Sequence, residues 1–296
     1  MSFTAMLCLV LAAVYASTCA LLSIGVALSW HAVLERRRLG ASELLTLRLA
    51  PAAGAAFLTL AVALPAFLIN EPRRNMEPAG PLLVLLAMFA LCTFGSGMWR
   101  GLRAWAATRA LLRDGPEPLA AVVGAWRPRI IAADRVRAAL SDEEFFQVIA
   151  HETAHMAVHD NVKLLLQIIS PDALTWLPAG TALTERWRAA AELEADARAG
   201  GLDPRKRLAL ASALLKVARL TITTERRSPA LLMPAVDDVA ARVRELLAPS
   251  PMRHGRLPRT LMACSLLIAV GGVSLYGSVH EWIESLVAFG IRYDRW

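Results

Sequence analysis

The chain has 296 residues, of which 56% are hydrophobic and 19% are charged, and its formal net charge is +7. A soluble domain is about a quarter charged, so this composition excludes an ordinary soluble globule and also a disordered chain. The hydrophobic excess lies in four stretches without charged side chains. Each stretch is long enough for a membrane-spanning helix of about 20 residues. The four stretches are residues 1–34, 49–70, 78–99 and 260–279.

We therefore predict a mainly α membrane protein with about four transmembrane helices. Three of them, at about 3–30, 49–70 and 81–99, form a membrane segment of residues 1–99, and the fourth spans residues 260–280. Polar residues 100–259 lie between the third and fourth helices and are numerous enough to bury a core of their own. The remaining residues, 281–296, are expected to form a short extracytoplasmic tail.

Arginines near the predicted helix ends indicate the orientation of the chain. They all lie on one side of the membrane if the N-terminus is outside: Arg36–Arg38, Arg100, Arg103, Arg253, Arg256 and Arg259. Because such residues favour the cytoplasmic side, we expect a plasma-membrane protein with a cytoplasmic polar domain and both termini outside. The first apolar stretch precedes its positive charges, which favours an uncleaved helix over a signal peptide. No basic stripe with interleaved aromatic residues is present, so we expect membrane lipid and not nucleic acid as a direct partner.

The polar domain is predicted to be mostly helical, with a small strand element. Two short apolar runs, residues 119–124 and 128–133, are typical of a hairpin or two neighbouring strands. Ser141 and Glu144 have the spacing of a capping box, which predicts a helix from there to about Val158. The apolar run 161–170 is too short to span a membrane. Further helices are predicted at residues 184–198, 204–220 and 236–247.

The predicted helix after Ser141 contains an H-E-x-x-H sequence, His151 to His155. Residues i and i+4 share a helix face, so both imidazoles can bind one Zn²⁺. Glu152 lies about 100° round the helix, where it can activate water but cannot easily join the ligand set. His159 is expected to be exposed or to lie behind the ligands, and Asp160 either ends this helix or anchors it.

A catalytic zinc takes three protein ligands, and the polar domain contains no cysteine. Glu192 is the best source of the third ligand, and Asp196 shares its helix face. Asp196 suits a role as acceptor for the second N–H group of a zinc-bound imidazole. Glu194 is expected to point into solvent. The alternative is that Glu192 and Asp196 form an ordinary surface pair near Arg188 or Arg198.

Taken together, these segments resemble the BlaR/MecR-type membrane metallopeptidases. The resemblance is carried by Pro128–Ile131, Leu140–Glu144, Val148–His155, Asp160–Asn161, Pro171–Pro178 and Glu192–Asp196. The position of the polar domain between the third and fourth predicted helices is similar as well. The resemblance implies a gluzincin-like α+β zinc protease domain in which His151, His155 and Glu192 bind zinc and Glu152 is the general base.

The resemblance also implies that the substrate is a cytoplasmic protein, often a transcriptional repressor or the membrane protein itself. Arg226 and Arg227, in a polar loop, are a candidate self-cleavage point. The antibiotic sensors of this family carry a large extracellular domain after the fourth helix. Residues 281–296 are too few for such a domain and contain no S-x-x-K element, so we expect no β-lactam sensing.

The leading hypothesis is thus an integral membrane zinc endopeptidase that acts in signalling. Its substrate could add as a strand to the edge formed by Arg129, Ile130, Ile131 and Ala132. One alternative is a membrane protease of the HtpX or CAAX type in protein quality control or processing, which shares H-E-x-x-H and E-x-x-A-D elements. The other is a non-catalytic membrane signalling protein, against which the intact Glu152 argues.

Overall fold

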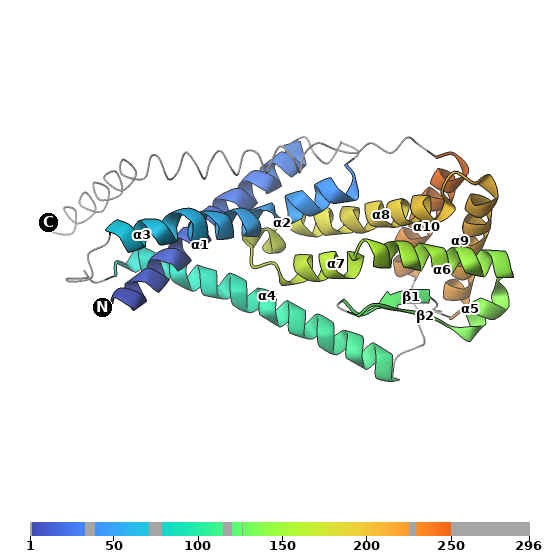
Figure 1. Ribbon diagram of the computed structural model, residues 1–296, viewed down its shortest axis with the longest axis horizontal. Helices are drawn as coiled ribbons and strands as arrows, with labels where there is room; N and C mark the ends of the chain where they lie inside the picture. The colour runs from blue at the N-terminus through green and yellow to red at the C-terminus, as the bar shows by residue number, and fades with distance from the viewer. Residues whose placement is uncertain are drawn as a thin grey trace.

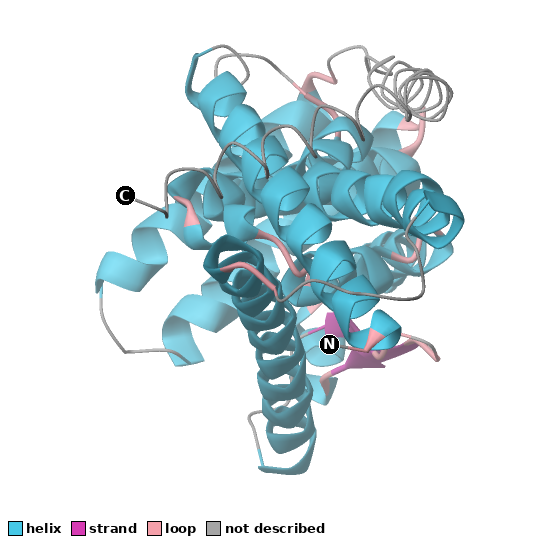
Figure 2. Cartoon of the chain, turned by 90° about the vertical axis from the view of Figure 1, so that its left-hand side faces the viewer, coloured by secondary structure: helices cyan, strands magenta, loops and turns pink. Residues whose placement is uncertain are grey.

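The computed structural model describes residues 2–32, 39–70, 79–114, 120–125, 127–224 and 229–249. This part of the chain is mainly helical, and Figure 2 shows its small hairpin as the magenta element among helices. The predicted fourth apolar helix, the tail, and Arg226 and Arg227 lie outside the described residues.

Three helices of the described part are long and apolar enough to cross a membrane, and they suggest a multi-pass membrane protein. The second span consists of two α-helices joined by a π-helical segment. In chain order the elements are α1 (Phe3–Ala32), α2 (Ala41–Leu58), η2 (Thr59–Ala63), α3 (Leu64–Asn70) and α4 (Pro81–Asp114). Figure 1 shows α4 as one long helix that runs from this group past the hairpin.

The second span begins at Ala41, ahead of the predicted Leu49, because its two charged residues have partners. Glu43 accepts a hydrogen bond from the backbone N–H of Gly40 at 3.0 Å. Arg48 is 2% exposed and forms an ion pair of 2.8 Å with Asp172, which is fully buried. A hydropathy pattern ends at charged residues, but the helix includes both of these because Arg48 is paired with Asp172 and the Glu43 carboxylate accepts a hydrogen bond at the start of the helix.

The polar region begins with the predicted hairpin, β1 (Ala120–Val123) and β2 (Arg129–Ala132). The strands are antiparallel, with Ala120 opposite Ala132. Two helices follow, α5 (Asp134–Ala139), which was not predicted, and α6 (Asp142–Ala157). The predicted capping box is confirmed at the start of α6. There Ser141 and Glu144 each bond the other's backbone N–H group, at 3.3 and 2.8 Å.

A sharp turn separates α6 from the next helix, because His159 has a φ of 58°. The later elements are α7 (Asp160–Ile169), η3 (Ala173–Trp176), α8 (Pro178–Gly200), α9 (Pro204–Thr224) and α10 (Pro229–Leu247). Both α8 and α10 begin earlier than predicted, each at a proline, which suits the first turn of a helix because its missing N–H group needs no partner there.

Helix α8 packs the polar region against the apolar helices α1 and α2. One buried apolar cluster joins α1, α2, η3 and α8 and consists of Trp30, Ala41, Leu44, Leu47, Leu174, Ala179, Leu183, Trp187 and Ala191. Arg100 of α4 adds hydrogen bonds of 2.8 Å to the backbone carbonyls of Ile168 and Ser170. The helix that carries Glu192 is therefore held directly by two of the apolar helices.

Candidate metal centre

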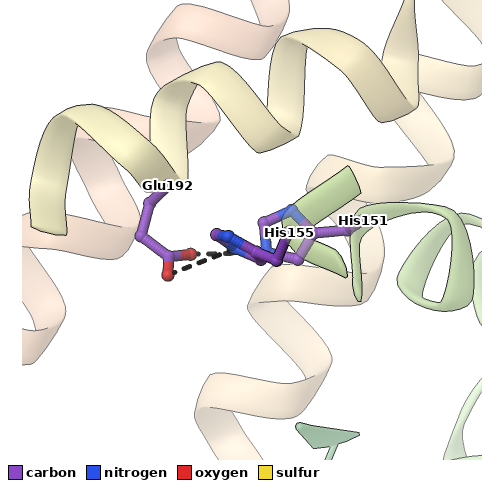
Figure 3. A group of neighbouring side chains, drawn as sticks. All are labelled: His151, His155 and Glu192. Atoms are coloured by element: carbon purple, nitrogen blue, oxygen red, sulfur yellow. Dashed lines mark hydrogen bonds and ion pairs between the residues drawn. The ribbon is translucent and has the colours of Figure 1, made fainter. Parts of the chain in front are cut away.

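Two helices, α6 and α8, bring His151, His155 and Glu192 together, and their imidazoles and carboxylate converge in Figure 3. The two Nε2 atoms lie 3.1 Å apart. Nε2 of His151 lies 3.3 Å from Oε2 of Glu192, and Nε2 of His155 lies 3.5 Å from Oε1. The i, i+4 spacing aligns the histidines, while the packing of α8 against α6 supplies the carboxylate.

This geometry fits a zinc ion. Zinc bonds to nitrogen and oxygen of about 2.0–2.2 Å at tetrahedral angles separate neighbouring donor atoms by about 3.3 Å. The separations of 3.1, 3.3 and 3.5 Å lie around that value, with the two contacts of Glu192 made by its two different carboxylate oxygens. Two imidazoles and one carboxylate are also a donor set that zinc takes in catalytic sites.

Each imidazole has a carboxylate behind it, as a metal-binding histidine usually does. Nδ1 of His151 lies 2.9 Å from Oδ1 of Asp196, and Nδ1 of His155 is hydrogen-bonded to Oδ2 of Asp160 at 2.8 Å. Both carboxylates favour a proton on Nδ1, which leaves the lone pair of Nε2 free for a metal. The two aspartates thus lie where the sequence interpretation suggested, and Asp160 anchors the start of α7 and not the end of α6.

Arg242 of α10 completes the site and was not foreseen from the sequence. It forms a bidentate pair with Asp196, with both contacts at 2.7 Å, and contacts Glu192 at 2.9 Å. Arg242 is buried on the same helix face as Val243 and Leu246. An arginine on the apolar face of an amphipathic helix is the signal that could have identified it, because such a charge requires a buried partner.

The surroundings of the site shift the pKa values of its groups. Burial lowers the pKa of His155, but its contacts with Asp160 and Glu192 outweigh burial and raise it to about 9. Burial raises the pKa of Glu192, yet the histidines and Arg242 hold it well below the usual range. Without a cation between them the two rings therefore attract protons, and a metal ion would take the place of that positive charge.

Glu152 lies beside the three convergent residues and not among them. Burial raises its pKa above the usual range, against the opposing effect of His151 and His155. The nearby backbone N–H of Val122 acts in the same direction as the histidines and lowers this pKa. A buried carboxylate with a raised pKa next to a metal site is suited to accept and return a proton near neutral pH.

The site opens into a cavity of about 450 Å³. Its walls include His151, Glu152, His155 and Glu192, and an apolar side formed by Leu210, Leu214 and Val217 of α9. Residues 120–122 of β1 line the cavity, whereas residues 129–132, the expected substrate edge, do not. The strand next to the metal site is therefore β1.

Two sequence-based expectations about nearby charges change in the structure, and the expected exposure of His159 is confirmed. Glu194 does not point freely into solvent, because it accepts a hydrogen bond from the N–H of Ala41 at 3.0 Å and so joins α8 to α2. Arg198 pairs with Glu194 and not with Glu192 or Asp196. His159 is exposed at the turn between α6 and α7 and is not part of the convergent group.

Comparison with known proteins agrees with the site. Residues 117–245, from just before β1 to near the end of α10, match the family model described as BlaR1 peptidase M56. No curated protein and no solved structure matches the chain. The matched region contains all the residues of the convergent group. Residues 117–245 are a peptidase domain of the BlaR1 M56 family, a family of zinc metallopeptidases.

Proposed function

We propose that this protein is a membrane-embedded zinc endopeptidase of the gluzincin type. The observation that carries the proposal is the convergence of His151, His155 and Glu192 beside Glu152 in an open cavity. The distances support tetrahedral zinc, and the family of residues 117–245 is zinc-dependent. A bound zinc ion supplies positive charge that polarises the peptide carbonyl and makes water a stronger acid.

Glu152 is the general base in this proposal. Its carboxylate accepts a proton from the attacking water and later passes a proton to the amine that leaves. Burial keeps the pKa of Glu152 above its ordinary value, which brings it closer to the working pH.

The substrate binds, we propose, as an extended strand along β1. This strand lines the cavity, and within the described residues its sheet has two strands, so one edge of β1 does not face β2. The outward carbonyl of Val122 is bonded to the side chain of Asn161, so a peptide would form its backbone hydrogen bonds at the start of the strand, around Ala120. The edge at β1 replaces Arg129 to Ala132 of β2 as the proposed substrate contact.

The substrate proposed is a cytoplasmic protein, with a transcriptional repressor or the chain itself as the first candidates. The arginines near the ends of the apolar helices support a cytoplasmic peptidase domain in a plasma-membrane protein with both termini outside. Arg226 and Arg227 are the first positions at which to look for self-cleavage.

The proposal is tested with the full chain in lipid nanodiscs and in the cells that express it. Purified wild type should contain about one zinc ion per chain. Quantitative proteomics should find at least one protein fragment in cells with wild type that disappears in Glu152→Gln. Glu143→Gln, on the exposed side of the same helix, is the matched control and should leave the fragment in place.

Two results would overturn the proposal. One is wild-type protein that binds no zinc at neutral pH. The other is an identical set of fragments from wild type and Glu152→Gln, since the amide cannot act as a base.

A further inference from the structure

Arg188 of α8 lies in the wall of the cavity that contains the metal site. Its side chain is exposed, and no carboxylate of the described residues forms an ion pair with it, including that of Glu185 three residues earlier. The other arginine of the described cavity wall, Arg242, is engaged by Asp196 and Glu192. The charge of Arg188 is therefore available to a molecule that enters the cavity.

The metal site withholds from Arg188 the acid that lies closest to it on the helix. Residues four apart are neighbours on one helix face and can form an ion pair, so Glu192 is the natural partner of Arg188. Oε2 of Glu192 instead lies 3.3 Å from Nε2 of His151, and Oε1 lies 3.5 Å from Nε2 of His155. Glu192 also contacts Arg242 at 2.9 Å. The guanidinium of Arg188 is thus left unpaired one helical turn from the convergent group.

This position brings Arg188 close to the residues that flank the bond to be cut. Four residues along an α-helix correspond to about 6 Å, and successive residues of an extended peptide are about 3.3 Å apart. A peptide that lies in the cavity with one carbonyl at the metal site therefore has Arg188 within about three residues of that carbonyl. The planar guanidinium offers a fork of N–H donors that fits a carboxylate.

Much of the remaining cavity wall is apolar, which makes an unpaired cation selective. Val148 of α6 and Leu210, Leu214 and Val217 of α9 line the cavity. Such a wall accepts apolar side chains without reading their identity. An acidic side chain gains an ion pair at Arg188, whereas a lysine or arginine of the substrate meets a like charge there.

We propose that Arg188 is a specificity residue, which binds an acidic side chain of the substrate close to the bond that is cut. This inference rests on the proposed endopeptidase function and deepens it, because it assigns a substrate class. The class is peptides in which an aspartate or glutamate accompanies apolar residues. The C-terminus of a peptide carries the same chemical group, so peptides with free and amidated ends distinguish the two sources.

The first measurement is of peptide binding and does not require cleavage. It uses the full chain with Glu152→Gln, loaded with zinc, in nanodiscs of zwitterionic lipid. The probe is a fluorescent peptide of four Leu-Glu repeats with an amidated end, compared by anisotropy with the same peptide of Leu-Gln repeats. The Leu-Glu peptide should bind about fivefold more tightly or better, and adding Arg188→Gln should remove the difference. Arg205→Gln, an exposed arginine of α9 outside the cavity wall, is the matched control and should preserve it.

The second measurement is of cleavage by the zinc-loaded chain with Glu152 intact. A library of peptides from a digested proteome is incubated with the protein, and the new ends are identified by mass spectrometry. Aspartate and glutamate should be enriched within about three residues of the cut. Arg188→Glu should replace that enrichment by one of lysine and arginine, because it reverses the charge that the substrate meets.

Four results would overturn the inference. One is a Leu-Glu peptide that binds no more tightly than the Leu-Gln peptide when Arg188 is present. Another is a preference for the Leu-Glu peptide that Arg188→Gln leaves unchanged. The third is an equal loss of binding for both peptides in Arg188→Gln, which would show that Arg188 supports the cavity and does not select an acid. The last is a Leu-Gln peptide with a free end that binds as tightly as the amidated Leu-Glu peptide, which would assign Arg188 to the chain terminus.

The two measurements separate this inference from the proposed function. An Arg188-dependent preference for the Leu-Glu peptide, without cleavage of any peptide by the wild type, would support Arg188 as an acid-binding residue and count against the peptidase alone. Cleavage at sites without enrichment of acids would support the peptidase and overturn the role of Arg188.

Discussion

Two buried polar clusters, both built on an arginine–aspartate pair, differ in how completely they are closed. The anchor cluster joins Arg48 of α2 to Asp172, whose carboxylate also accepts bonds from Ser170 and Thr175. The metal cluster joins Arg242 to Asp196 and continues to Glu192, whose side chain is 34% exposed. In the anchor cluster, hydrogen-bond donors surround the carboxylate of Asp172. In the metal cluster, two imidazoles and one carboxylate point toward one another next to a cavity.

This difference separates a structural role from a chemical one. In the anchor cluster the donors surround the carboxylate, so nothing further is needed to stabilise it. In the metal cluster two Nε2 atoms and a carboxylate face one another, an arrangement that a cation would stabilise. The clusters are also connected, because the anchor lies between α7 and α8, and these two helices carry Asp160 and Glu192.

The largest expected effect is a loss of thermal stability when the ion pair of the anchor cluster is removed. Arg48→Met leaves the fully buried Asp172 without its cation, and breaking a buried pair in this way costs about 3–5 kcal/mol. The variant should unfold at a clearly lower temperature than wild type when both are heated in nanodiscs. The double variant Arg48→Met with Asp172→Leu should regain much of the loss, since the unpaired charge is gone. A single variant as stable as wild type would show that the pair does not hold the two regions together.

In the metal cluster, we expect Arg242→Met to lower the affinity for zinc. Asp196 and Glu192 would lose the guanidinium that orients them, and changes behind metal ligands cost about 10- to 100-fold in affinity. Competition with a chelator of known affinity measures the change. Arg242→Lys keeps the charge without the bidentate geometry and should fall between wild type and Arg242→Met. Equal zinc affinity in all three proteins would exclude a role for Arg242 at the metal.

The same comparison shows which parts of the molecule a sequence can predict. The H-E-x-x-H ligands and the Ser141 capping box depend on residues three or four apart, so helix geometry alone predicts them. Glu192 could be predicted as a ligand because a catalytic zinc requires a third protein ligand and the polar domain has no cysteine. Arg242 and Arg48 meet their aspartates across 46 and 124 residues, and such pairs depend on how helices dock, which no local pattern encodes.

The smallest effect concerns Glu144, which belongs to neither cluster and joins the start of α6 to α9. Burial raises its pKa, but hydrogen bonds from Lys216 and Ser212 outweigh burial and lower it to about 2. A carboxyl whose pKa is lower in the folded state stabilises the fold above its unfolded pKa, and that contribution is lost as the pH falls toward 2. At pH 7, Glu144→Gln should therefore be less stable than wild type by about 1 kcal/mol. The difference should shrink between pH 5 and pH 3 in denaturation experiments. A difference that stays constant over that range, or that Glu143→Gln reproduces, would show that the charge of Glu144 is not what holds α6 to α9.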